Sequence, residues 1–138
     1  MDKLGILARG VFAAALFAVS AQGAPTPLGA TLRVTVEGVT AAGGTLRVGL
    51  YDEATFPALP DVPLFKREIA KAAGNLVVTF DRLPPGTYAV KALQDVNNDG
   101  KWEMGEPFGI SGGATRDNFD AAAIVLQPGA NTVTVRLQ

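Results

Sequence analysis

The chain has 138 residues, of which 48% are hydrophobic and 18% charged, and its formal net charge is −1. That length suits one globular domain with a core and leaves no room for a second. The absence of any basic run argues against nucleic acid or an anionic membrane surface as a partner. The sequence has no histidine and no cysteine, which excludes imidazole-based and thiol catalysis, disulfides and the usual zinc sites.

The start of the chain predicts a cleavable signal peptide over residues 1–23. Cationic residues near the start are followed by an apolar run over residues 11–19, and small residues then favour cleavage before Ala24 or, alternatively, after Ala21. An uncleaved membrane anchor is disfavoured, because a bilayer span needs about 20 uninterrupted apolar residues. Arg9 interrupts this stretch.

We therefore expect an exported protein that is periplasmic or secreted. After cleavage we expect no membrane span, and the absence of cysteine removes the residue that carries the lipid anchor of exported bacterial lipoproteins. A short leader over residues 24–30 precedes a domain over residues 31–138. Residues 24–138 hold 10 Lys and Arg against 12 Asp and Glu, a net charge of −2.

Short segments with a period of two follow the leader, separated by Gly, Pro or Asn, as is typical of β-strands. Residues 31–37 and 45–51 both alternate apolar and polar side chains. Because Gly43-Gly44 joins these two segments, we interpret them as a hairpin.

The middle of the chain predicts three more strands. Prolines exclude a long helix or a central strand over residues 52–63, and residues 64–70 are expected to form an edge strand. Residues 75–81 alternate again and end in the turn at Pro84-Pro85-Gly86. Both faces of residues 87–94 are fairly apolar, which favours a central strand.

Two further strands, residues 121–127 and 131–137, close the chain around a Pro128-Gly129 turn. Tyr88, two residues after the Pro-Pro-Gly turn, is expected to be a tyrosine corner that bonds to the backbone. With about seven strands and no convincing helix after the signal peptide, the sequence predicts an all-β fold. We expect an antiparallel β-sandwich of the immunoglobulin-like or transthyretin-like kind.

Residues 95–106 match the pattern D-x-[DN]-x-[DN]-G-x5-E of a twelve-residue calcium loop at every specified position. Calcium takes six to eight oxygen ligands, and alternate positions of a loop can wrap around one ion. Gly100 permits the sharp turn that such a loop needs. The expected metal ligands are Asp95, Asn97, Asp99, the Lys101 carbonyl, Glu103 and Glu106.

A plain acidic turn is the alternative for the same loop, because Asn-Asn-Asp-Gly favours turns through its own side-chain hydrogen bonds. Helices do not flank the loop, which excludes a helix-loop-helix unit. A bound cation relieves the repulsion among four acidic side chains. If calcium binds, we expect a dissociation constant of about 10⁻⁴ to 10⁻³ M, as in extracellular modules.

Three aromatic residues, Trp102, Phe108 and Tyr51, support a different function, a carbohydrate- or small-ligand-binding module. A carboxylate pair such as Glu103 and Glu106 suits glycoside hydrolysis in principle, but a domain this small offers little cleft around a sugar. We therefore expect no enzyme. The leading hypothesis is a non-catalytic binding or structural module in the cell envelope, whose partner is an envelope protein or a glycan.

Three segments resemble the bacterial family catalogued as domain of unknown function 2141. They are Leu-Pro-Pro-Gly-Thr-Tyr-Ala-Val at 83–90, Asp-Val-Asn-Asn-Asp-Gly-Lys at 95–101 and Glu-Pro-Phe-Gly-Ile-Ser at 106–111. Phe119-Asp120-Ala121-Ala122 is similar to the Phe-x-x-Ala segment of that family. The resemblance spans about residues 31 to 137 and implies an exported β-sandwich without an established activity.

The chain differs from the family's usual pattern in the stretch before Glu106, which is shorter here and lacks a Gly-Ile-Pro step. Two roles for Glu106 follow from this difference. It closes the metal site, or it belongs to the Glu-Pro-x-Gly-x-Ser segment that begins there, and the two roles are compatible.

Overall fold

A computed structural model describes residues 29–70 and 72–138 of the chain. The expected signal peptide over residues 1–23 and most of the expected leader lie outside the described residues. The strands are β1 (Ala30–Glu37), β2 (Thr45–Tyr51), β3 (Phe65–Ala70), β4 (Leu76–Leu83), β5 (Gly86–Asp95), β6 (Phe108–Ile110), β7 (Ile124–Leu126) and β8 (Gly129–Arg136). Between β6 and β7 lie a 3-10 turn, η2 (Ser111–Gly113), and one helical turn, α1 (Phe119–Ala122). Among the described residues, no helix has the length and apolar character that crossing a membrane requires.

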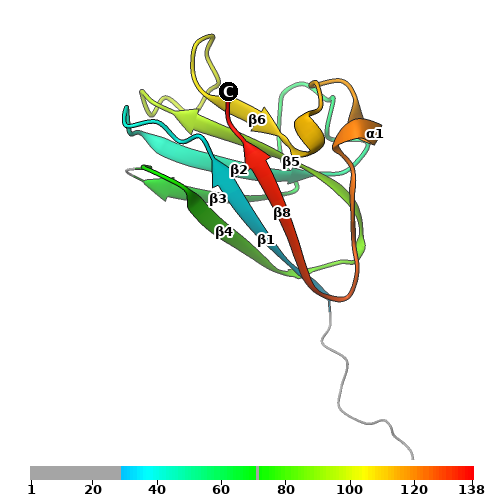
Figure 1. The fold of residues 1–138 in the computed structure, drawn as a ribbon. Coiled ribbons are helices and arrows are strands. Elements are labelled where there is room, and N and C mark those ends of the chain that lie inside the picture. The colour runs from blue at the N-terminus through cyan, green and yellow to red at the C-terminus, as the bar shows by residue number, and fades with distance from the viewer. Residues whose placement is uncertain (1–28, 71) are drawn as a thin grey trace, which may run out of the picture.

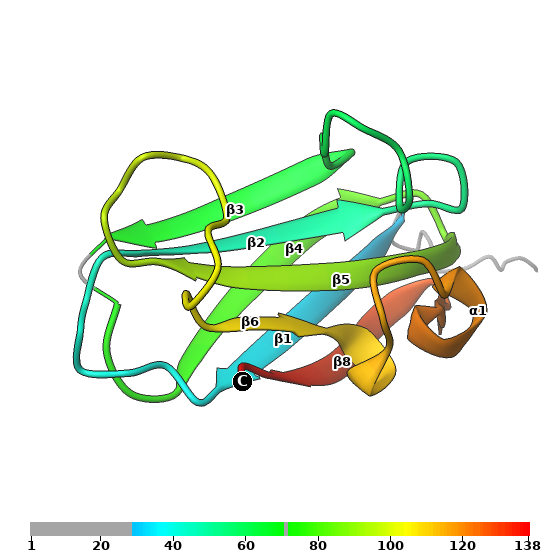
Figure 2. The ribbon, with the colours of Figure 1, turned by 90° about the horizontal axis from the view of Figure 1, so that it is seen from above.

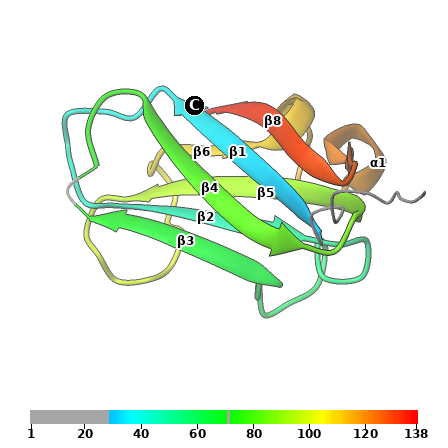
Figure 3. The same ribbon diagram turned by 90° about the horizontal axis from the view of Figure 1, so that it is seen from below.

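Two β-sheets pack face to face (Figure 1 and Figure 3). One has the strand order β4-β1-β8, and the other has the order β3-β2-β5-β6, with β7 also paired to β5. The pairings are antiparallel except that of β1 with β8, which is parallel. The predicted all-β sandwich is therefore confirmed, with eight strands in the described part of the chain.

The core between the sheets is built from the apolar positions that alternate in the sequence. Leu32, Val34 and Val36 of β1 have no exposed surface, and neither have Leu46 and Leu50 of β2. Each fully buried side chain of this kind contributes about 1.5–3 kcal/mol. The two inner faces therefore hold the sheets together.

The predicted hairpin at Gly43-Gly44 is wrong. Strand β1 pairs with β4 and β8, whereas β2 pairs with β3 and β5 in the other sheet. Each strand has both edges filled by partners that lie further along the chain, so neither edge is left for the other. The buried Gln94 fixes the crossing segment: its Oε1 accepts a 2.8 Å hydrogen bond from Thr40 N, and its Nε2 donates to Gly43 O at 2.7 Å.

Three other predictions for the middle of the chain are confirmed. The edge strand expected over residues 64–70 is β3, at one edge of the five-stranded sheet. The central strand expected over residues 87–94 is β5, which has partners on both sides. The hydroxyl of Tyr88 donates a 2.6 Å hydrogen bond to Pro84 O, which is the expected tyrosine corner.

The segment before β7 is helical where the sequence predicts a strand. The strand expected over residues 121–127 begins only at Ile124, because α1 occupies the preceding residues. Asn118 caps this turn, since its Oδ1 accepts a 3.1 Å hydrogen bond from Ala121 N. The sequence predicts no helix after the signal peptide, and the single helical turn α1 corrects that prediction.

Strand β6 lies in a glycine-rich stretch for which the sequence predicts no strand. Besides pairing with β5, Phe108 exchanges two backbone hydrogen bonds with Gln138, of 3.0 and 3.3 Å. A Cβ at Gly109 would lie only 2.2 Å from Arg136 O. Glycine therefore allows β6 to approach the end of β8 this closely.

A second apolar cluster covers part of the outer face of the five-stranded sheet. Tyr51, Ala89 and Ile110 project from β2, β5 and β6 and pack with Phe56 and Phe119. The Phe56 ring meets those of Tyr51 and Phe119 edge-on, with centroids 6.3 and 5.6 Å away. This cluster fixes the loop after β2 and the α1 turn over the sheet (Figure 2).

Candidate functional site

The acidic loop begins at Asp95, whose side chain is fully buried at the end of β5. Asp95 Oδ2 accepts hydrogen bonds of 2.8 Å from Gly100 N and from Arg47 Nε, and Oδ1 accepts one of 3.3 Å from Asp99 N. Gly100 has a φ of +80°, which suits the turn expected there. Asp95 therefore holds the first half of the loop closed from inside.

The ionisation of Asp95 reflects these contacts. Burial raises the pKa of the Asp95 carboxyl, but the hydrogen bonds from Arg47 and Gly100 and the charge of Arg47 outweigh it. The net pKa lies below its usual value, and the carboxylate stays ionised inside the protein.

Glu106 closes the second half of the same loop. Its Oε2 accepts a 2.8 Å hydrogen bond from Val96 N, and its Oε1 accepts a 2.9 Å bond from Glu103 N. One carboxylate thus ties the start of the loop to its end, directly before β6. The observed partners of Glu106 are backbone N–H groups, and its expected role as a metal ligand stays a prediction.

The remaining expected ligands lie on the exposed part of the loop. Asn97 Nδ2 donates to Glu103 Oε1 at 2.5 Å and to Asp99 Oδ2 at 3.4 Å. Asp99 Oδ1 accepts a 2.9 Å hydrogen bond from Lys101 N. Within residues 29–70 and 72–138, no three acidic side chains are grouped as a metal site requires.

A groove of about 590 Å³ lies beside this loop, over the outer face of the five-stranded sheet. Figure 2 looks onto that face, with the acidic loop at one end and α1 at the other. Gly49 of β2 lies on its floor, where an added Cβ would come within 2.8 Å of Pro63 Cβ. The side chains and loops that form the rest of the groove include Arg47, Tyr51, Asp61, Lys66, Glu68, Lys91, Lys101, Trp102, Phe108 and Arg116.

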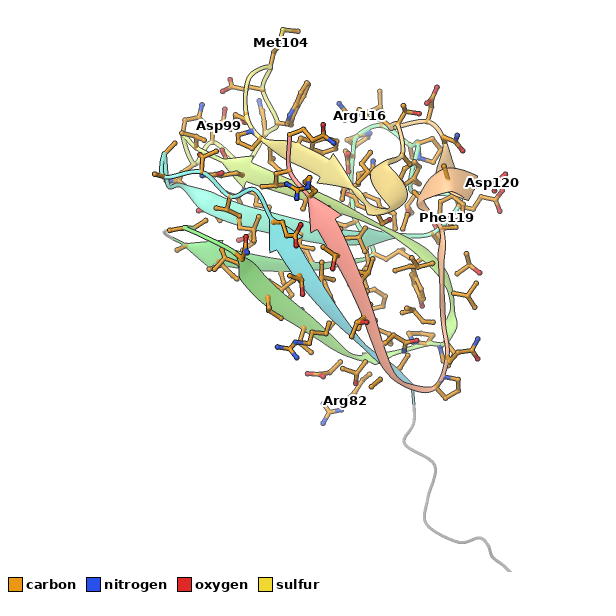
Figure 4. The ribbon with its side chains drawn as sticks, viewed as in Figure 1. Arg82, Asp99, Met104, Arg116, Phe119 and Asp120 are labelled. Carbon is orange, nitrogen blue, oxygen red and sulfur yellow. The ribbon has the colours of Figure 1, made fainter. Side chains whose placement is uncertain are left out.

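Aromatic rings and one guanidinium form one wall of the groove. The rings of Trp102 and Phe108 lie 5.9 Å apart, tilted by 58°. The Arg116 guanidinium lies over both rings, 5.2 Å from the Trp102 centroid and 5.4 Å from that of Phe108. Trp102 remains 40% exposed. The side chain of Arg116 is on the same side of the molecule as the acidic loop, which carries Asp99 and Met104 (Figure 4).

A partly buried ionic network lies next to this wall, since Asp61 Oδ2 is 3.8 Å from Arg116 Nη2. Lys91 Nζ donates to Phe56 O at 2.7 Å and to Asp61 Oδ2 at 3.1 Å, and it lies 4.3 Å from the centre of the Tyr51 ring. Tyr51 donates a 2.5 Å hydrogen bond from its hydroxyl to Asp61 Oδ1. Burial lowers the pKa of Lys91 despite the opposing effect of Asp61, and burial raises the pKa of Tyr51, together with its hydrogen bond to Asp61.

The structure thus brings Tyr51, Trp102 and Phe108 around one groove, as the small-ligand hypothesis requires, although Tyr51 is almost buried. The sequence does not point to the charged partners of these rings. Lys91 has the clearest signal, because it is a charged residue within a strand whose two faces are otherwise apolar. Asp61 and Arg116 lie in loops far apart in the sequence and carry no such signal.

Comparison with known proteins identifies the family. A search of curated proteins and a search of solved structures give no match. A family model described as "Uncharacterized protein conserved in bacteria (DUF2141)" matches residues 34–134, which include the acidic loop and the groove. The resemblance found in the sequence is therefore confirmed, and the chain belongs to this bacterial family.

Proposed function

We propose that this protein is an exported, non-catalytic binding module that holds a small organic ligand in the groove over the five-stranded sheet. The observation that carries the proposal is the wall formed by Trp102, Phe108 and Arg116 beside that groove. A glycan of the cell envelope is the ligand we favour, because a sugar ring presents an apolar face that stacks on an aromatic side chain.

The groove has the features of a ligand site. Its volume of about 590 Å³ falls within the range of about 300–1,000 Å³ that is common for such sites. Seven charged side chains line it beside the aromatic rings, so it is more polar than a typical drug-binding pocket and suits a polar ligand such as a sugar. Trp102 combines a contact with Phe108 and an exposed fraction of 40%, so part of its surface is available to a ligand.

Export and the lack of catalysis are parts of the same proposal. The N-terminal sequence supports export, with the mature protein in the periplasm or secreted. The absence of histidine and cysteine supports a binding role. Lys91, the buried amine of the groove, already donates to a carbonyl and a carboxylate.

A second proposal concerns calcium in the acidic loop, which the complete motif match favours. A carboxylate oxygen has two lone pairs, so an oxygen of Glu106 that accepts one N–H can still face a cation. Asp95 fits less well, because Arg47 already supplies a positive charge to its Oδ2. Calcium would therefore draw the exposed Asp99 and Glu103 together with Asn97 and Glu106, and its expected effect is to order the loop that carries Trp102.

A glycan array with two variants tests the binding proposal. Trp102→Ala removes the exposed ring, and Met104→Ala is the matched control, because Met104 is 92% exposed on the same loop and lies outside the groove lining. We expect the wild-type protein and Met104→Ala to bind the same glycans and Trp102→Ala to lose at least about tenfold in affinity. Equal binding by all three proteins, or binding by none, would contradict the proposal.

A further inference from the structure

We infer that the groove selects a ligand with a single carboxylate next to its ring, an acidic sugar such as a hexuronic acid. This inference rests on the proposed function and names the substrate class of the same site. The argument compares the charged side chains of the groove: its carboxylates are paired with cations of the protein, whereas several of its cations lack a close partner.

The two carboxylates that line the groove are both neutralised by neighbouring cations. Glu68 Oε2 accepts a 2.5 Å hydrogen bond from Arg47 Nη1, and the same guanidinium also pairs with the buried Asp95. Asp61 accepts hydrogen bonds from Lys91 and from the hydroxyl of Tyr51. Neither carboxylate is therefore left to attract a cationic ligand.

Three other cations line the groove, and none of them has a close ion pair among the described residues. They are Lys66, Lys101 and Arg116. Lys66 and Lys101 are exposed and form no ion pair with another residue in the described part of the chain. Arg116 approaches Asp61 only to 3.8 Å and donates no hydrogen bond to the residues that the structure describes. The groove thus has an excess of positive charge, although the whole chain has a formal net charge of −1.

Arg116 is the group best placed to bind the acid. Its guanidinium lies over the rings of Trp102 and Phe108, and the side chain is 47% exposed. A planar guanidinium binds a carboxylate through two parallel N–H bonds. A ligand whose ring lies along the exposed part of Trp102 would therefore bring a neighbouring carboxylate to Arg116.

The surroundings of the groove favour one negative charge over two. The loop over residues 95–106 contributes Gly100, Lys101 and Trp102 to the groove, and its carboxylates at Asp99, Glu103 and Glu106 lie outside the groove lining, in the same loop. A phosphate dianion would be repelled by these carboxylates more strongly than a carboxylate would. The carboxylates of the loop therefore favour a monoanion over a dianion.

Three sugars that share one ring test this inference: methyl glucoside, its 6-carboxylate and its 6-phosphate, together with the same three compounds in the galacto series. Trp102 is the only tryptophan in the sequence, so its fluorescence follows binding in each titration. In at least one of the two series, we expect the 6-carboxylate sugar to bind about tenfold more tightly than the neutral sugar at low salt. This preference should fall as salt is added.

Variants assign the preference to the groove. Arg116→Gln and, separately, Lys101→Gln are expected to reduce the preference for the carboxylate, while Arg82→Gln keeps it, because Arg82 lies at the opposite end of the molecule (Figure 4). Equal binding of acid and neutral sugar, or tighter binding of the phosphate, would overturn the inference. If none of the six sugars binds, the inference fails, and the glycan array decides independently whether the groove binds neutral ligands.

Discussion

Arg47 of β2 donates a 2.8 Å hydrogen bond from its Nε to Oδ2 of Asp95, a side chain with no exposed surface at the end of β5. This ion pair joins the start of β2 to the start of the acidic loop. The loop that carries Trp102 therefore depends on a cation supplied by the protein itself, which is present whether or not a metal binds.

Replacing Arg47 with methionine leaves the buried carboxylate of Asp95 without a counter-charge. Breaking a buried ion pair in this way costs about 3–5 kcal/mol, and we expect about 2–3 kcal/mol here because the Arg47 side chain is 26% exposed. Urea unfolding at pH 7 measures the loss. Glu68→Gln is the matched control, since it removes only the exposed partner of Arg47 and should cost under about 1 kcal/mol.

The same variant has a characteristic pH dependence. In the wild type the pKa of folded Asp95 is lowered, so its stabilising effect is present above the unfolded pKa of about 3.9 and is lost as the pH falls through the folded value. In Arg47→Met the hydrogen bond and the charge of Arg47 are lost, and we expect burial to outweigh the backbone hydrogen bonds that remain and to raise the pKa of Asp95, so that protonation stabilises the folded state. The stability difference between the two proteins should therefore shrink as the pH falls from 7 to 4, and a constant difference would contradict this account.

Tyr88→Phe tests the tyrosine corner. The variant keeps the ring in the core and removes the 2.6 Å hydrogen bond to Pro84 O. We expect a loss of about 0.5–1.5 kcal/mol in the free energy of unfolding, measured in urea. Unchanged stability would show that this hydrogen bond does not stabilise the turn between β4 and β5.

Calcium should raise the melting temperature if it orders the acidic loop. At ten times its dissociation constant the ion adds about 1.4 kcal/mol of stability. Thermal melts in calcium and in chelator measure this effect, with Glu103→Gln as the variant that should reduce it. Identical midpoints in both solutions would remove the calcium proposal and leave Arg47 as the cation of the loop.

The sequence predicts much of the fold because strands with one buried face alternate every second residue. The inner positions of β1 and β2 follow this rule, as do those of β4 and β8. The period identifies a strand but not its partner, which explains the wrong hairpin at Gly43-Gly44. Strand β6 is too short for any period, and its position depends on backbone contacts with Gln138.

The candidate site is predictable only in part for a related reason. The local sequence identifies Asp95, Gly100 and Glu106 as the main positions of the acidic loop, but it does not predict that Arg47 and backbone N–H groups are the partners of the two carboxylates. The groove forms from segments that the fold brings together, so Arg47, Lys91 and Arg116 have no shared local pattern. Their role depends on contacts between strands and between loops that are far apart in the sequence. The spacing of residues along one sequence does not reveal such contacts.

The most direct test of the groove as the binding surface uses the single tryptophan of the chain. A ¹⁵N-labelled sample has one indole N–H signal, from Trp102, and it can be followed as a glycan selected on the array is added. We predict that this signal moves saturably, with the dissociation constant of the glycan, and that the amide signals of Gly49 and Arg116 move with it. A fixed indole signal, while amide signals of β1 and β4 in the opposite sheet move, would contradict the account.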